Sequence, residues 1–316
     1  MSLLALLASL AAQYAHPPRA RQWLTALYGR LCLYTGRRFN AGDRNSGIVA
    51  WLAMMAVALV PVALVTAGAA AIHAIVLWAF EVAVLYLTLR FLATVAQVSD
   101  IEAELRAGNV AAAAERLAQW QGEPLETSDA GLVSRLAVEH ALREAHYGTF
   151  APLFWFIVLP GPIGLVAYPL ALRAAQTWEH LVEAGGPRLS GPFDERDFGW
   201  FAARAFHAID WIPQRLTAFA FAVVGDFEDA LFCWRSQAAQ WVRPEEGIVL
   251  ASGAGALGVR LGDAIALAGG QQVERPPLGL GEPAREDALA SLGGLAWRAL
   301  IVWMIVYLLV AAIKGP

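Results

Sequence analysis

The chain has few charged residues, only two cysteines and no excess of basic residues. Only 16% of its 316 residues are charged, against about 25% in ordinary soluble domains. The net charge of −4 and the lack of a basic arm with interleaved aromatic residues argue against nucleic acid as a partner. Cys32 and Cys233 lie far apart and outside any CxxC motif, which argues against a disulfide framework or a zinc site. What remains is a mainly apolar chain.

Long uncharged runs are what the sequence has instead. Hydrophobic residues make up 58% of the chain, and the mean hydropathy is +0.50. Residues 48–89 carry almost no charge, and small residues interrupt this run only at 67–71. One helical crossing of a bilayer needs about 20 apolar residues. The run therefore predicts a hairpin of two membrane-crossing helices. We expect an integral membrane protein whose first partner is the lipid bilayer.

The rest of the chain divides around this hairpin. We expect an all-α integral membrane protein with about four to five membrane-embedded helices, some broken or re-entrant, and a cytoplasmic helical insert. The expected parts are an N-terminal apolar segment with a basic amphipathic region (1–47), the hairpin (48–90), the helical insert (91–148), a membrane-associated core (149–270), a linker (271–294) and a C-terminal transmembrane helix (295–316).

Two apolar stretches allow more than one arrangement. Residues 1–15 are short for a full crossing, so they form a tilted span, which we favour, or lie in the membrane interface. Residues 149–175 are interrupted by Pro160-Gly161-Pro162. Proline removes a backbone donor and breaks helices. This stretch therefore forms a kinked span, a re-entrant pair of half-helices, or a span that ends at Pro160.

A basic segment precedes the hairpin. Its arginines face a single acid, Asp43, and they are Arg19, Arg21, Arg30, Arg37, Arg38 and Arg44. Apolar residues recur at helical spacing between Trp23 and Tyr34, which predicts an amphipathic surface helix. Short arginine-rich segments beside a span stay in the cytoplasm. We therefore expect a multi-pass protein of a bacterial inner membrane with this segment and Arg90 on the cytoplasmic side.

Glu81 lies in the middle of the second predicted crossing, and His73 lies two turns before it. A carboxyl group at the centre of a bilayer costs about 2.5 kcal/mol or more, so it should face protein. Two roles fit this pair of intramembrane polar residues. They form a proton or ligand site, or they make a polar contact that fixes helix packing.

A dense group of titratable residues precedes the return to the membrane. It consists of Glu139, His140, Arg143, Glu144 and His146. Glu139 and Arg143 are four residues apart and can pair on a helix. The group is either part of a metal site, which would need a further ligand from elsewhere, or a solvated helix face.

Two later segments combine an arginine with an acid. Asp210 and Arg215 flank Pro213, and Asp210 is a candidate cap for the helix expected at 208–224. Arg260 lies in a glycine-rich segment that ends at Asp263, where it is a candidate phosphate clamp. The letters GAGALG at 253–258 match GxGxxG, but no strand pattern precedes them. We therefore do not assign a dinucleotide site.

Several of these segments together resemble one family. They are VE at 138–139, Gly148, APLF at 151–154, LPG at 159–161, DWIP at 210–213, RLTA at 215–218 and GALGVRLG at 255–262. From about residue 134 to 263, the chain resembles the adenosylcobinamide-phosphate synthase family of cobalamin biosynthesis (CobD/CbiB) and its AmpE-like membrane relatives. The segments run in the family's order.

The resemblance implies a reaction and a set of site residues. The reaction would join a carboxyl group of adenosylcobyric acid, a corrinoid, to aminopropanol phosphate, with ATP and Mg²⁺ as cofactors. By position, the resemblance implies Glu139 and Asp210 as catalytic residues. It implies Arg215 and Arg260 as substrate- or phosphate-binding residues, and it leaves the metal ligands unassigned.

The sequence departs from the family's pattern at two places. The stretch that usually reads AENxSDG reads REAHYG at 143–148, so Arg143, Glu144 and Tyr147 replace an acidic residue, an asparagine and an aspartate. An asparagine-glycine-tryptophan run is also missing, with residues 245–248 in its place. These departures predict a degenerate active site, because a scaffold can outlast its activity. The alternative function is a non-enzymatic, AmpE-like membrane modulator or scaffold that binds a membrane partner protein.

Overall fold

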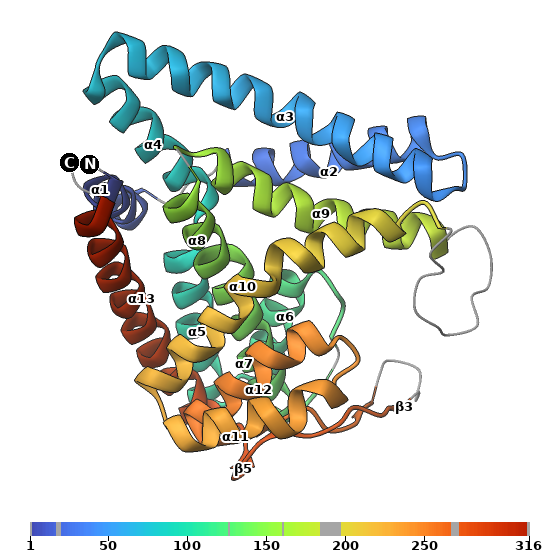
Figure 1. The fold of residues 1–316 in the computed structure, drawn as a ribbon. Coiled ribbons are helices and arrows are strands. Elements are labelled where there is room, and N and C mark those ends of the chain that lie inside the picture. Colours follow the sequence, from blue (N-terminus) through green and yellow to red (C-terminus); the bar gives the residue numbers. More distant parts are fainter. Residues whose placement is uncertain are drawn as a thin grey trace. The chain divides into compact units, whose positions relative to one another are not determined.

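The computed structural model describes residues 2–16, 20–125, 127–159, 161–183, 197–266 and 272–314. Within these residues the fold is almost entirely helical (Figure 1). The chain forms two compact units, and each is built from two separate stretches of sequence. The first unit contains Met1–Leu89 and Ala151–Trp211, and the second contains Arg90–Phe150 and Ile212–Pro316.

The first unit contains the predicted hairpin. Its helices are α1 (Ser2–Ala15), α2 (Ala20–Phe39), α3 (Arg44–Ile72), α4 (Ala74–Thr88), α8 (Ala151–Val158), α9 (Ile163–Glu183) and the first part of α10 (Trp200–Val224). The helices α3 and α4 meet in a tight turn at His73. By length and composition, α3 and the stretch Ala74–Arg106 are candidate membrane spans. The expectation of an apolar helical hairpin is therefore confirmed.

A buried core joins α2, α3, α9 and the start of α10. Its members are Cys32, Ala50, Met54, Met55, Leu170, Ala171, Ala174, Trp178, Phe198 and Ala202. The indole Nε1 of Trp178 donates a 2.9 Å hydrogen bond to the carbonyl oxygen of Cys32. At Gly47 the backbone of α3 approaches that of Phe198 so closely that a Cβ would collide with its carbonyl oxygen. Close packing of this kind explains why small residues are frequent here.

The apolar stretch 149–175 is divided among several short elements and the start of α9. The helical conformation is interrupted between α8 and α9, where Gly161 has a φ of 64°. Pro160 lies outside the described residues. In α9, Tyr168 and Trp178 are buried in the protein core. Among the described helices, neither α8 nor α9 is a candidate span, and α1 is a shorter apolar helix. The arrangement of α1 in or on the membrane stays a prediction.

The second unit begins with the polar insert, which is helical as predicted. Its helices are α5 (Phe91–Arg106), α6 (Val110–Gln121), α7 (Ala130–Ala145), the π-helical turn η1 (His146–Phe150), the end of α10, α11 (Phe227–Gln237), the 3₁₀ turn η2 (Ala238–Gln240), α12 (Pro244–Leu257) and α13 (Glu286–Lys314). Gly122 follows α6 with a φ of 79°, a left-handed conformation that ends a helix. The sequence predicted a helical insert over 91–148, and α5, α6 and α7 lie within it.

Short strands lie between α12 and α13, at the end of the predicted core (149–270) and within the predicted linker (271–294). In one small sheet, β1 (Val259–Leu261) lies between antiparallel β4 (Leu278–Gly279) and parallel β5 (Glu282–Pro283). In the other, β2 (Ile265–Ala266) pairs antiparallel with β3 (Gln272–Val273). Strands of two or three residues are too short for an alternating apolar pattern to predict them.

The last helix, α13, contains the third candidate span found in the described part of the chain, Glu286–Ile313. Its first half packs against the second unit through Trp297, whose ring lies 4.7 Å from that of Phe91. Its second half exposes large apolar side chains, among them Ile305, Leu308 and Leu309. Such a surface is expected where lipid is the solvent. The protein is therefore an all-α membrane protein, and three helical stretches among the described residues are candidate spans.

Candidate functional site

The candidate site is centred on α7 and its continuation. The N-terminus of α7 is capped by Asp129, whose side chain accepts a 2.8 Å hydrogen bond from the amide of Gly131. At its other end, α7 continues into η1, which overlaps the REAHYG stretch where the sequence departs from the family's pattern. Single π-helical turns are rare and frequently occur at functional sites.

Glu139 on α7 is buried, with 2% of its surface exposed. The guanidinium of Arg275 donates to both of its carboxylate oxygens, from Nη1 to Oε2 at 2.7 Å and from Nη2 to Oε1 at 3.2 Å. The amide of Gly262 donates a further bond of 2.9 Å to Oε1. A bidentate guanidinium–carboxylate pair is among the stronger polar contacts in proteins. Glu139 is therefore fully engaged by the protein itself.

Arg275 also holds the turn that follows β1. Its Nη2 donates to the carbonyl of Gly262 at 3.1 Å, and its Nε donates to the carbonyl of Asp263 at 3.2 Å. Both turn residues have positive φ, 79° for Gly262 and 63° for Asp263. A Cβ at Gly262 would also collide with the carbonyl oxygen of Pro276. The sequence analysis did not single out Arg275, because it lies in the glycine- and proline-rich segment read as a linker.

Asp263 links this turn to Arg260. Its Oδ2 lies 3.3 Å from Nη1 of Arg135 on α7 and 3.4 Å from Nε of Arg260 on β1. Arg260 is 43% exposed, and among the described residues its terminal nitrogens have no hydrogen-bond partner. The structure thus brings the predicted residues Glu139 and Arg260 into one set of contacts. We call the set of Arg135, Glu139, Arg260, Asp263 and Arg275 the Glu139 network.

The Glu139 network does not fit a magnesium ion. Mg²⁺ prefers carboxylate oxygens and water. Both oxygens of Glu139 accept hydrogen bonds from protein donors. The Oδ2 atom of Asp263 lies beside the guanidinium groups of Arg135 and Arg260. Within the described ranges, there is no group of three or more histidine, cysteine or acidic residues that could hold a metal. The network contains three arginines and only two carboxylates, so it carries an excess of positive charge. The terminal nitrogens of Arg260 can therefore bind an anion.

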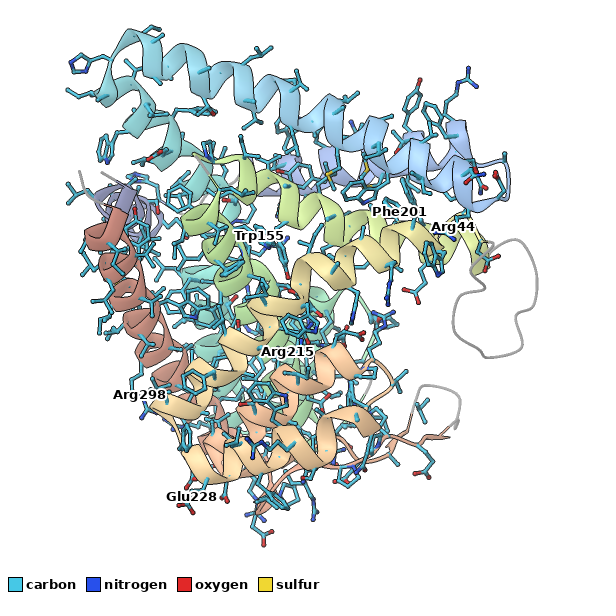
Figure 2. The ribbon with its side chains drawn as sticks, viewed as in Figure 1. Arg44, Trp155, Phe201, Arg215, Glu228 and Arg298 are labelled. Carbon is cyan, nitrogen blue, oxygen red and sulfur yellow. The ribbon has the colours of Figure 1, made fainter. Side chains whose placement is uncertain are left out.

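Asp210 belongs to the first unit, and its predicted role as a helix cap is wrong. The helix α10 begins at Trp200, so Asp210 lies in its interior, and Pro213 is also inside the helix. The buried Asp210 accepts a 2.7 Å hydrogen bond from the hydroxyl of Tyr168, which is also buried. Arg215 is half-buried on the part of α10 that belongs to the second unit (Figure 2).

The two departures from the family's pattern meet in the structure. Arg143, from REAHYG, lies 3.7 Å from Glu246, which stands where the asparagine-glycine-tryptophan run is missing. Glu246 also lies 3.4 Å from Arg243, and Glu144 lies 3.1 Å from Arg90. The predicted contact between Glu139 and Arg143 does not form, because Glu139 pairs with Arg275. Ion pairs therefore occupy the positions where the family's polar residues are replaced.

Among the described residues, the two histidines of this region belong to no group of three metal-ligating side chains; His140 is half-buried and His146 is buried. Burial lowers the pKa of His140 to about 4; Glu144 acts against this shift, and Arg143 and Arg90 add to it. The ring of His140 packs edge-on against Trp120, with centroids 4.5 Å apart. His146 is buried, and its Nδ1 lies 3.0 Å from Oγ1 of Thr217 on α10. His140 is therefore neutral at physiological pH.

The two intramembrane candidates take different positions. Glu81 is buried on α4, within the candidate span Ala74–Arg106. His73 lies in the turn between α3 and α4, where it is exposed and its Nδ1 accepts a 3.1 Å hydrogen bond from the amide of Ile75. This bond makes His73 the N-cap of α4. A proton or ligand role for Glu81 stays a prediction.

The apolar spans and the arginine–carboxylate network define an α-helical membrane protein with an anion-compatible site in its second unit. The chain belongs to the CobD/Cbib protein family, whose model matches residues 3–295. It is 32% identical over 285 residues to "Cobalamin biosynthesis protein CobD" of Stutzerimonas stutzeri, covering 89% of this chain and 88% of that protein. It is 36% identical over 238 residues to the protein of the same name from Chromobacterium violaceum, covering 74% and 71% of the two chains. No solved structure matches the chain.

Proposed function

We propose that this protein acts in cobalamin biosynthesis at the membrane. The support is the family match over almost the whole chain and the names of the two relatives, together with three candidate spans among the described residues. The relatives do not favour the AmpE-like alternative, since both carry the cobalamin name. The arginine-rich segment before α3 supports placement in an inner membrane with that segment in the cytoplasm.

We propose further that the site is degenerate for the reaction that the resemblance implies. That reaction joins adenosylcobyric acid to aminopropanol phosphate and uses ATP and Mg²⁺, and the Glu139 network does not fit the Mg²⁺ ion. The observation that carries the proposal is that Arg275 and Gly262 engage both oxygens of Glu139. Glu139 then holds the turn after β1 in place, and Arg260 beside that turn binds the phosphate group of the ligand.

The roles that we propose for the other two predicted site residues, Arg215 and Asp210, are less specific. Arg215 is a second candidate for a phosphate group, and Asp210 is a candidate for a polar contact with ligand. The hydroxyl of Tyr168 already donates a 2.7 Å hydrogen bond to Asp210. A corrinoid is the proposed ligand, and a membrane protein of the same pathway is a proposed partner.

A direct assay tests the proposed function. The full chain is purified in detergent, mixed with adenosylcobyric acid, aminopropanol phosphate and Mg-ATP, and compared with the Chromobacterium violaceum relative as a positive control. Because a single lost catalytic contact costs about 100-fold in rate, we expect turnover at least about 100-fold slower than that of the relative. Corrinoid absorbance should nevertheless remain with the protein after gel filtration.

The two parts of the proposal fail in different ways. Turnover equal to that of the relative would show that the site is intact and would overturn the proposed degeneracy. A preparation that elutes as a folded particle but shows no corrinoid binding and no turnover would overturn a role in the cobalamin pathway.

Arg260→Ala is expected to weaken binding of aminopropanol phosphate about tenfold, because a charge-assisted hydrogen bond contributes roughly 1.5–3 kcal/mol. Calorimetric titration of the purified variant measures the change. Arg285→Ala, which removes an exposed arginine just before α13, is the matched control and should bind as the unmodified chain does. Both variants should fractionate with membranes. Unchanged affinity in Arg260→Ala would remove the phosphate role.

A further inference from the structure

The outer face of α2 carries a regular stripe of exposed residues. Trp23, Leu27, Arg30, Tyr34 and Arg37 follow each other at intervals of four, three, four and three, and all are exposed. This spacing places them on one side of a helix. Trp23 and Tyr34 are each 66% exposed. The opposite side of α2 packs into the core of the first unit through Cys32.

Toward the end of α2, this stripe widens into a shallow hollow. Its lining residues are Arg30, Leu33, Tyr34, Arg37 and Arg38. Within the described part of the chain, the three arginines have no ion-pair or hydrogen-bond partner. Three unpaired guanidinium groups around one hollow repel each other unless an anion lies between them. The hollow therefore has the charge and the donors to receive a phosphate group.

Neighbouring arginines of the same segment are used differently. Arg21 donates a hydrogen bond to the backbone carbonyl of Leu89. Arg44, at the start of α3, lies with its guanidinium carbon 4.1 Å from the ring centroid of Trp200, in the region where Figure 2 labels Arg44 beside Phe201. These contacts fix structure inside the first unit. They leave Arg30, Arg37 and Arg38 as a separate basic surface.

The hollow lies on α2, a helix that packs against the candidate membrane span α3. Only residues 40–43 separate α2 from α3, and the two helices pack side by side (Figure 1). Along α3, Val49, Leu52 and Val57 are exposed, which makes an apolar surface in the same unit. Exposed tryptophan and tyrosine beside arginine are typical of the zone where lipid headgroups meet hydrocarbon.

We propose that the hollow on α2 binds the headgroup of an anionic phospholipid, with Arg30, Arg37 and Arg38 on its phosphate. The acyl chains of that lipid would cover exposed apolar side chains of the first unit. A lipid fits better than a soluble phosphate, because the hollow is open to solvent and salt screens an exposed charge from a free ion. A lipid gains apolar burial in addition to the charge contact.

A titration of the full chain in detergent micelles tests this proposal. The probe is dioctanoyl phosphatidylglycerol, and dioctanoyl phosphatidylcholine is the neutral comparison. In the variant Arg30→Gln/Arg37→Gln/Arg38→Gln, affinity for the anionic lipid should fall about tenfold or more, since each basic residue near a membrane surface contributes a few-fold. Affinity for the neutral lipid should stay the same. Changing the three arginines to lysine should restore most of the binding, because the charges remain.

A second triple variant is matched in charge. Arg116→Gln/Arg235→Gln/Arg285→Gln removes three exposed arginines of the second unit, and it should bind the anionic lipid as the unmodified chain does. Should the α2 triple variant fail to fold, Arg37→Gln alone should weaken binding about threefold. Unchanged binding in the α2 variants would overturn the proposal. Displacement of the lipid by equal concentrations of inorganic phosphate would also overturn it, in favour of a soluble anion site.

Discussion

Arg275→Ala is expected to lower the free energy of unfolding by about 3 kcal/mol, because removing one partner of a buried ion pair leaves the other charge uncompensated. In this protein the remaining charge is the carboxylate of Glu139, which is 2% exposed. The variant also loses the two bonds that Arg275 donates to the carbonyl groups of the turn after β1. Equilibrium unfolding of the detergent-solubilised chain, followed by circular dichroism, measures the effect.

The pair of Glu139 and Arg275 has two informative comparisons. Arg285→Ala removes an exposed arginine from the same part of the chain and should change stability by no more than about 0.5 kcal/mol. The double variant Glu139→Gln/Arg275→Ala should be less destabilised than the sum of its single variants, since no buried charge is left alone. Strictly additive effects, or a loss below about 1 kcal/mol for Arg275→Ala, would contradict the role given to this pair.

The second large effect is expected at Gly255 in α12. A Cβ at this position would lie 2.5 Å from the carbonyl oxygen of Asp229 and 2.7 Å from the Cα of Ala230, both in the backbone of α11. Backbone atoms cannot rotate away as a side chain does, so α11 and α12 would have to separate. Gly255→Ala should therefore cost about 2–3 kcal/mol in stability, which the same unfolding measurement detects.

Gly293 in α13 provides the matched control. It is also a glycine inside a helix of the second unit, but nothing lies within 4 Å of a Cβ built there. Gly293→Ala should be neutral or stabilising by up to about 1 kcal/mol, because alanine loses less backbone freedom on folding. Equal losses in the two variants would show that helix flexibility, rather than contact between α11 and α12, accounts for the effect.

The close contact at Gly255 also shows what the sequence could and could not predict about the segment 253–258. Its letters match a nucleotide motif, but they lie at the end of α12, and Gly258 takes the left-handed conformation that ends the helix. The absence of a preceding strand pattern was sufficient to set the motif aside. The distances to α11 were not predictable, since small residues serve equally for helix packing and for ligand approach.

Prediction succeeded where one physical signal was strong and local. The run of about forty residues with almost no charge predicted the hairpin that α3 and α4 form, and the helical insert predicted over 91–148 contains α5, α6 and α7. The sequence left three arrangements open at 149–175, because hydrophobicity alone does not distinguish a membrane span from a buried core helix. Only the structure shows that Tyr168 and Trp178 of α9 are enclosed by protein.

The candidate site was predicted in part. Glu139 and Arg260 were selected, and they belong to one network, but their mutual contacts run through Arg275 and Asp263. Arg275 is 136 residues from Glu139 in sequence. A single sequence contains no signal for a pair at that separation, and the strands that bring it close are two or three residues long. The catalytic role predicted for Asp210 and the phosphate-binding role predicted for Arg215 stay predictions.

The interleaved order of the two units has a consequence for how the chain is made. The ribosome releases α2 and α3 first, but their partners Trp178 and Phe198 follow only after the whole first stretch of the second unit has been synthesised. That stretch in turn lacks α12 and α13 until residues 151–211 of the first unit have been synthesised. A single truncation therefore cannot isolate either unit without a stretch of the other, and expression trials should use the uncut polypeptide.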